Sequence, residues 1–128
     1  MGQLTEINGP RTDVTDTTTL VYYANAPEEG NNRGRLYTIT NALGQVTTFS
    51  NYDANGNVGT ITAPDGVVTV RTYDQRNRLL TSTNQSTNGQ IQYFYDGRGN
   101  LSYVIPPEGN RIDYTYNLAD RLTGIQDN

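Results

Sequence analysis

The sequence predicts an all-β fold, an antiparallel sheet of tandem β-hairpin repeats with a period of 21–22 residues. The first observation behind this prediction is a Tyr-Asp dipeptide that recurs at regular spacing. The second is the composition, because the ten Tyr favour strands and the thirteen Gly favour turns. The third is that no segment has the periodicity or the caps of a long helix.

The dipeptide marks one end of each repeat. Its tyrosines are separated by 21, 22 and 21 residues, and the last copy has Asn in place of Asp. The copies are Tyr52-Asp53, Tyr73-Asp74, Tyr95-Asp96 and Tyr116-Asn117. After each of them a short turn leads into a new strand, which starts near Val58, Leu79, Leu101 and Leu122. Leu36, after Gly34-Arg35, fits the same position one repeat earlier.

A second turn lies in the middle of each repeat, at Gly44, Gly66, Gly89 and Gly109. Asn-Gly and Asp-Gly between β-prone runs are strong hairpin signals, because both residue types tolerate positive φ. In the third repeat we expect a strand over residues 78–83, a turn at Asn88-Gly89 and a return strand over residues 90–95. The Asp after each Tyr is expected to cap the other turn through backbone N–H groups two residues on.

Alternation of side chains predicts two ladders across the sheet. One ladder joins Leu36, Val58, Leu79, Leu101 and Leu122, and the other joins Tyr52, Tyr73, Tyr95 and Tyr116. Such cross-strand neighbours contribute about 0.2–1 kcal/mol per pair. Strict alternation also places Leu101, Tyr103 and Ile105 on one face of their strand and Val104 on the other.

The N-terminal quarter is less regular, so we predict two regions. Residues 1–33 form a degenerate repeat and a loop, in which Gly2-Gln3-Leu4 fits a repeat start, Gly9-Pro10 breaks any strand and residues 20–23 form a return strand. Residues 34–128 form the tandem repeats, over residues 34–51, 52–72, 73–94, 95–115 and, as a partial repeat, 116–128. The last strand has no hairpin partner after it, which predicts either a piece of a longer array or a chain that pairs with another copy.

Charge and composition exclude several classes of function. The net charge is −4 and all nine cationic residues are Arg, without the basic patch that nucleic-acid binding needs. No apolar run approaches the roughly 20 residues of a membrane span, and residues 1–20 lack the apolar core of a signal peptide. We therefore expect no nucleic-acid partner, no membrane insertion and no signal peptide in this segment.

Once the repeats are aligned, the chain resembles the YD-repeat, or Rhs-repeat, family of large bacterial proteins. The family pattern has a Gly-Arg-Leu-like start, a central Gly turn and a Tyr-x-Tyr-Asp-x-x-Gly close. Gly34-Arg35-Leu36, residues 93–99 and residues 114–117 match it most closely. The resemblance is good over residues 34–128 and loose over residues 2–33. Val58 in place of Leu and Asn117 in place of Asp depart from the pattern.

The resemblance implies a long sheet that spirals into a hollow, shell-like structure. In Rhs proteins, toxin-complex subunits and teneurins, that shell encloses a toxin domain or a peptide segment. For this chain it implies a structural, non-enzymatic wall segment, with an enclosed polypeptide and neighbouring repeats as partners. It also implies secretion or delivery to the cell surface as part of a larger bacterial protein. The family's C-terminal self-cleavage motif has no match, so no catalytic residue is carried over.

The residue types of an active site are scarce. His and Cys are absent, which removes the usual general base, thiol nucleophile and zinc ligands. The repeated carboxylates suggest a glycosidase pair, but their recurrence in the same turn favours local capping. Residues 53–57 resemble the start of a calcium loop, yet Pro64 stands where the bidentate Glu belongs. The sequence therefore predicts no enzyme activity, no cofactor and no metal site.

Two alternative functions stay open. Tyr rings on a groove or sheet face, with Arg nearby, commonly bind sugars or partner chains, which predicts a glycan- or receptor-binding module. Against this, the Tyr ladder is expected to pack on the Leu ladder as the inner core. Open strand edges predict the other alternative, a self-assembling building block that forms homo-oligomers by pairing strand to strand.

Overall fold

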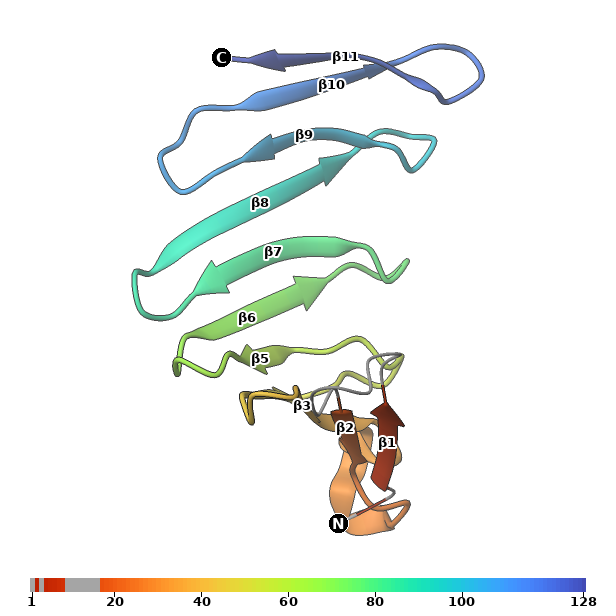
Figure 1. Cartoon of the computed structure of the whole chain (residues 1–128). Coiled ribbons are helices and arrows are strands. Elements are labelled where there is room, and N and C mark those ends of the chain that lie inside the picture. Colours follow the sequence, from red (N-terminus) through yellow and green to blue (C-terminus); the bar gives the residue numbers. More distant parts are fainter. Residues whose placement is uncertain (1, 3, 9–16) are drawn as a thin grey trace. The chain divides into compact units, whose positions relative to one another are not determined.

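A computed structural model describes residues 2, 4–8 and 17–128 of the chain. These residues form eleven β-strands and one short 3-10 helix, which confirms the predicted all-β class. The strand order in the sheet follows the chain from β1 to β11, and neighbouring strands of known register run antiparallel (Figure 1). The chain divides into two compact units, Met1–Thr69 and Val70–Asn128, with the boundary inside β6.

The first unit holds five complete strands and the helix. The strands are β1 (Leu4–Asn8), β2 (Thr17–Tyr22), β3 (Leu36–Thr40), β4 (Val46–Ser50) and β5 (Thr60–Thr62). The helix η1 (Pro27–Asn32) fills the predicted N-terminal loop, and Gly30, with φ at 56°, interrupts it. The expected return strand at residues 20–23 is part of β2, whereas Gly9-Pro10 and Gln3 lie outside the described residues.

One strand of this unit begins later in the sequence than predicted. β5 begins at Thr60 and not at Val58, which lies half-buried in the connection before it. Gly59 lies so close to the preceding turn that a Cβ atom would stand 2.3 Å from the carbonyl oxygen of Asn51. This close approach, together with the positive φ of 55° at Asn51, keeps residues 51–59 out of the ladder.

The second unit is a run of hairpins. Its strands are β6 (Val68–Tyr73), β7 (Leu79–Asn84), β8 (Gly89–Tyr95), β9 (Leu101–Ile105), β10 (Ile112–Tyr116) and β11 (Leu122–Asp127). The Asn88-Gly89 turn predicted between β7 and β8 is wrong in detail. The turn spans residues 85–88, Gly89 already pairs with Asn84, and Asn88 takes the positive φ of 57°. The Asn84 side chain accepts a 2.9 Å hydrogen bond from the Ser86 N–H, which starts the turn earlier than the dipeptide suggested.

A β-bulge recurs where a Tyr strand meets the strand after it. The register skips one residue so that Tyr22 faces Leu36, Tyr95 faces Leu101 and Tyr116 faces Leu122. Each bulge places two residues opposite one and interrupts the alternation of side chains. The three bulges therefore lie at equivalent positions of three repeats.

The bulge between β8 and β9 shows that one prediction is wrong, namely that Leu101 and Tyr103 share a face of their strand. Tyr103 lies opposite Phe94, and their rings stack at 4.4 Å, whereas Leu101 lies opposite Tyr95. Because Phe94 and Tyr95 point to opposite faces of β8, Leu101 and Tyr103 also lie on different faces. Val104 lies opposite Tyr93 and is the one buried side chain among the described residues, at 7% exposure.

Few side chains are enclosed because, within each unit, the described residues supply no second layer that packs on the strands. Apart from Val104, every residue of the described strands whose side chain is placed is half-buried or exposed. A sheet of this kind is held together by its hydrogen-bond ladder and by neighbouring side chains on each face. Within residues 2, 4–8 and 17–128, no helix has the length and apolar character needed to cross a membrane.

Candidate functional site

The recurring chemical feature of the chain is its set of Tyr-Asp turns, which we call the turn edge. It comprises residues 53–57, 74–78, 96–100 and 117–121. In each turn the first N–H donates to the carbonyl oxygen of the fifth residue, as Asp74 does to Arg78 at 2.9 Å. The fourth N–H donates back to the first carbonyl oxygen, at 3.0 Å between Asn77 and Asp74. These two hydrogen bonds close every turn in the same conformation.

The first side chain of each turn caps it. In the second turn, Oδ1 of Asp74 accepts hydrogen bonds from the N–H groups of Arg76 and Arg78, at 2.8 and 2.9 Å. Asp53, Asp96 and Asn117 accept the same two bonds in their own turns. Since the Asn117 amide does what the carboxylates do, this position needs a side-chain oxygen and not a charge.

The fourth residue of each turn has positive φ. The angles are 91° at Gly56, 65° at Asn77, 89° at Gly99 and 59° at Asp120. Gly, Asn and Asp are the residues that adopt this conformation most readily. The residue type at this position therefore follows from backbone geometry, and no catalytic role is required to explain it.

The ladder tyrosines tie each repeat to the one before it. The hydroxyl groups of Tyr52, Tyr95 and Tyr116 donate to the carbonyl oxygens of Leu36, Leu79 and Leu101, at 2.7, 2.8 and 2.8 Å. All three tyrosines are half-buried. The structure thus brings predicted Tyr and Leu positions together, since Tyr95 contacts the Leu79 carbonyl on one side and faces Leu101 on the other.

The remaining predicted positions occupy matching places in the repeat. Tyr73 ends β6 and is half-buried, and Val58 precedes β5. Gly44, Gly66 and Gly109 have positive φ in the mid-repeat turns, whereas Gly89 belongs to β8. Leu122 differs from the other Leu ladder positions because it is 51% exposed.

Arginine side chains lie along the turn edge. Arg78 forms an ion pair with Asp74, at 2.7 Å between Nε and Oδ2, and its guanidinium lies 4.4 Å from the ring centre of Tyr95. Arg35 covers the next turn of its unit so closely that a Cβ atom on Gly56 would stand 2.3 Å from Nη1. Arg98 pairs with Asp120 at 2.9 Å. Such cation–π and ion-pair contacts add stability mainly where they are partly desolvated.

Three carboxylates of the turn edge, those of Asp53, Asp74 and Asp120, have a lowered pKa. The side-chain amide of Asn57 is the main cause that lowers the pKa of Asp53, and the backbone N–H of Arg78 is the main cause for Asp74. The pKa of Asp120 is lowered first by the Asn100 amide and then by Arg98. In contrast, burial raises the pKa of Tyr95. A general acid would need a raised carboxyl pKa, and these shifts run in the opposite direction.

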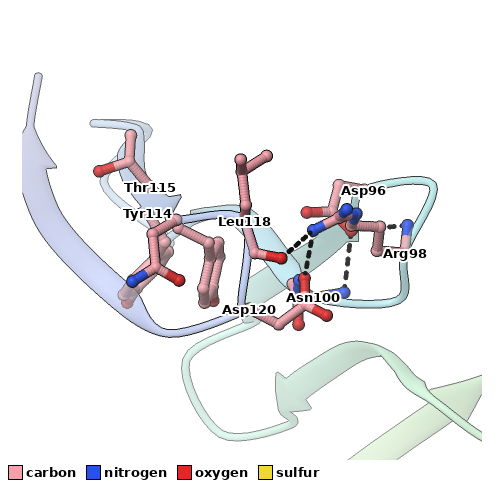
Figure 2. Close-up of a pocket in the computed structure, with 9 residues that line it drawn as sticks. Asp96, Arg98, Asn100, Tyr114, Thr115, Leu118 and Asp120 are labelled. Carbon is pink, nitrogen blue, oxygen red and sulfur yellow. Dashed lines mark hydrogen bonds and ion pairs between the residues drawn. The ribbon is translucent and has the colours of Figure 1, made fainter.

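A shallow pocket of about 290 Å³ lies on the turn edge of the second unit (Figure 2). Apolar and aromatic side chains contribute to its lining, at Tyr114, Tyr116 and Leu118, together with the polar side chains of Asp96, Arg98, Asn100 and Asp120. Its polar groups already bind one another, because Arg98 and Asn100 both donate to Oδ1 of Asp120 at 2.9 Å. The Tyr116 hydroxyl is likewise engaged by Leu101. A sugar in this pocket would have to compete with these hydrogen bonds.

The geometry of residues 53–57 does not support their interpretation as a calcium-binding loop. Both oxygens of Asp53 are engaged within its own turn, Oδ2 by the Asn57 amide at 3.0 Å. In the part of the chain that the structure describes, no three His, Cys, Asp or Glu side chains gather as metal ligands would. The turn edge therefore consists of capped turns with Arg and Asn side chains between them.

The sequence alone did not reveal three features of the turns and their contacts. The first is the turn of residues 41–45, where Asn41 makes the same two capping bonds without a preceding Tyr. The second is the reach of each Tyr hydroxyl to a carbonyl 15–16 residues earlier. The third is the contact between an Arg or Asn and the turn of the next repeat. Only the first had a visible signal, the spacing of Asn41 and Gly44.

Comparisons with known proteins identify the repeat. The family model described as RHS Repeat matches residues 31–68 and again residues 52–91. No curated protein sequence matches the chain. Among solved structures, a chain of the crystal structure described as TcdB2-TccC3-Cdc42 is similar, with a TM-score of 0.45 and 18% identity. That alignment covers 89% of this chain and 7% of the other chain, so the present chain corresponds in length to a small part of it.

The matched residues contain the features described above. Two overlapping matches displaced by 21 residues reproduce the period of the Tyr-Asp dipeptide. The first covers η1 to the start of β6, and the second continues from Tyr52 into β8. The resemblance stated from the sequence is thereby confirmed, and a structural repeat role is supported. Residues 31–91 of the chain match the RHS-repeat family.

Proposed function

We propose that this chain is a structural, non-enzymatic wall segment of a β-shell that encloses another polypeptide. The observation that supports it is the single layer of strands, in which only Val104 is buried among the described residues. A sheet with apolar side chains normally packs one face against another layer. In a shell, the enclosed chain and the continuing repeats supply that layer.

Both faces carry side chains suited to such contacts. Tyr93 and Phe94 are neighbours in β8, point to opposite faces and are both half-buried. Aromatic side chains contribute strongly to protein contacts because they bury a large area at low conformational cost. The inner face of the proposed wall would contact the enclosed polypeptide, and the other face would meet solvent or further parts of the parent protein.

The test places one photo-crosslinking residue on each face of β8. p-Benzoylphenylalanine replaces Tyr93 in one sample and Phe94 in the other, and the protein is isolated from its natural source after irradiation. We expect one of the two positions, and not both, to crosslink to a polypeptide outside the repeats. Mass spectrometry of the crosslinked peptides identifies the partner. Absence of such crosslinks from both positions would contradict enclosure.

The same proposal includes secretion or surface delivery as part of a larger bacterial protein. Its support is the RHS-repeat match over residues 31–91. Fractionation of the source cells and their medium, followed by detection with an antibody against residues 34–128, tests it. Detection in the cytoplasm alone would contradict this part of the proposal.

A second candidate is pairing between copies of the chain. It is favoured by one observation: β11 is the last strand of the sheet and, among the described residues, pairs only with β10. An unpaired strand edge presents N–H and C=O groups that can bind another strand. Light scattering over a range of concentrations tests this candidate, since pairing of copies makes the mass rise with concentration.

A further inference from the structure

One dipeptide of the sequence carries chemistry that the repeat does not require. Asn-Gly occurs three times, at Asn8-Gly9, Asn55-Gly56 and Asn88-Gly89. Gly9 lies outside the described residues, so the structure compares the other two sites. Both Asn55 and Asn88 are exposed. Because exposure does not distinguish them, a difference in their reactivity has to come from the turns that hold them.

Asparagine is a thermolabile residue, and a following glycine favours the loss of its amide group because glycine has no Cβ to hinder the reaction. The glycine nitrogen forms a bond to Cγ of the asparagine, its proton passes to solvent, and the side-chain nitrogen leaves as ammonia. Water then opens the resulting succinimide ring at either carbonyl and gives aspartate or isoaspartate. The ring closes only after the glycine N–H has left its hydrogen bonds and the backbone has rotated.

The turn that holds Asn55-Gly56 opposes this reaction. The Gly56 N–H donates to the carbonyl oxygen of Asp53 at 3.1 Å. Oδ1 of Asp53 accepts hydrogen bonds from the N–H groups of Asn55 and Asn57, both at 2.9 Å. Arg35 also covers the turn, since a Cβ atom on Gly56 would stand 2.3 Å from its Nη1. Attack by the Gly56 nitrogen therefore requires the capped turn to open first.

Asn88-Gly89 lies instead at the end of a hairpin. Gly89 pairs with Asn84 at the last position of the β7–β8 ladder, where local opening costs the least free energy. The Gly89 N–H donates at 3.1 Å to Oγ1 of Thr87, whose side chain is exposed. Fraying of this one end therefore frees the Gly89 nitrogen while the rest of the hairpin stays paired.

We propose that Asn88 is a modification site of the folded chain, where spontaneous deamidation gives aspartate and isoaspartate, and that the capped turn protects Asn55 from the same reaction. Either product adds a negative charge to the β7–β8 hairpin. Isoaspartate also lengthens the main chain by one methylene group next to Gly89, where a Cβ atom would already stand 3.3 Å from Pro107. The modification thus loosens this end of the hairpin. The proposal does not depend on whether the wall encloses a polypeptide.

The test incubates the whole chain in mildly alkaline buffer and follows both sites by mass spectrometry. Cleavage after arginine separates them, because one peptide covers residues 36–71 and another covers residues 79–98. We expect unmodified Asn88 to be lost about tenfold or more faster than Asn55 in the folded chain, and the two rates to become similar in guanidinium chloride. Hydroxylamine, which breaks the chain at a succinimide, should cut the folded chain between residues 88 and 89 and leave residues 55 and 56 joined.

Variants of Asp53 supply the decisive comparison. Asp53→Ala removes the cap and should speed the loss of Asn55 about fivefold or more, while the rate at Asn88 stays unchanged. Asp53→Asn is the matched control, because Asn117 makes the same capping bonds, and it should keep Asn55 protected. Equal rates at the two sites in the folded chain, a difference that persists in guanidinium chloride, or no effect of Asp53→Ala would overturn the proposal.

Discussion

At the scale of the residue, Tyr52, Tyr95 and Tyr116 each link two repeats. The hydroxyl of each donates to the carbonyl oxygen of a leucine in the previous repeat, as from Tyr95 to Leu79 at 2.8 Å. The Arg78 guanidinium lies over the Tyr95 ring. A Phe at this position would keep the ring contacts and lose only the hydrogen bond.

Tyr95→Phe should therefore lower the free energy of unfolding by about 1 kcal/mol, the usual contribution of one hydrogen bond. Urea denaturation followed by circular dichroism measures this change. Tyr103→Phe is the matched control, because the Tyr103 hydroxyl makes no hydrogen bond in the described part of the chain and its ring stacks on Phe94. Equal effects of the two substitutions would contradict the role of the hydroxyl.

Four carboxylates determine how the stability of the folded chain depends on pH. In the folded chain the pKa values of Asp53, Asp74, Asp113 and Asp120 are lowered by hydrogen bonds and neighbouring arginines. A lowered pKa means that the folded chain binds the proton less readily than the unfolded chain does. The resulting stability is present above the unfolded pKa of about 3.9 and is lost as the pH falls through the folded values.

We therefore expect the melting temperature to be constant near neutral pH and to fall as the pH drops below about 4. Thermal unfolding at several pH values measures it. Asp74→Asn keeps the capping oxygen, as Asn117 shows, but removes the titrating group. This variant should have a shallower acid transition than the wild type, and an identical transition would contradict the assignment of Asp74.

At the scale of the element, each Tyr-Asp turn has a left-handed backbone at its fourth position. Gly99 has φ at 89°, and Gly97 in the same turn has no positive φ. Neither a Cβ at Gly97 nor one at Gly99 would meet a close neighbour, the nearest being Arg78 at 3.8 Å from Gly99. Alanine at either position would therefore make no steric clash, and only alanine at position 99 would strain the backbone.

Gly99→Ala should destabilise the chain by about 1–2 kcal/mol because an L side chain strains the left-handed conformation. Gly97→Ala should change stability by less than about 0.5 kcal/mol. Gly99→Asn should recover part of the loss, since Asn77 holds the same conformation in its own turn. Denaturant unfolding of the three variants provides the measurement, and an equal cost of the two alanines would contradict this account.

The bulged strand β9 supplies the most buried side chain. Val104 faces Tyr93 on β8 and Ile112 on β10 and is 7% exposed. Val104→Ala should lower the free energy of unfolding by about 2 kcal/mol, through lost burial and the cavity left behind. Val46→Ala, at a valine 41% exposed, serves as the control and should have a smaller effect. Similar losses from the two variants would show that β9 does not form the core of its unit.

At the scale of the whole molecule, the open strand edges decide how the chain behaves in solution. The last strand β11 exposes Leu122 and Ile125, and the first strand β1 exposes Leu4. These edges would pair between copies only if their side chains were complementary. Within the second unit the strand that pairs with β7 ends in Tyr95, whose hydroxyl reaches the Leu79 carbonyl, whereas β1 contains no Tyr.

We therefore expect light scattering to give a mass near 14.2 kDa that is constant over a range of concentrations. A mass that grows with concentration would contradict this expectation and favour the second candidate function, pairing between copies.

The sequence by itself determined the class of the fold, the period and the capping of the Tyr-Asp turns. These features depend on residues two to four positions apart, such as Asp74 with Arg76 and Arg78, and local chemistry of that kind can be read from spacing. The RHS-repeat assignment rested on the same spacing and is confirmed by the family model. The division at residue 33 and the repeat boundaries remain predictions.

The tertiary structure alone decided which faces the side chains occupy and which groups meet across repeats. A bulge is a one-residue shift between two strands, so neither strand's own sequence shows that Leu101 and Tyr103 separate or that Val104 becomes buried. The Tyr95 hydroxyl and the Leu79 carbonyl are 16 residues apart, and only the pairing of β7 with β8 brings them together. Contacts between residues this far apart in the sequence depend on the register of the strands, which is set by many residues at once.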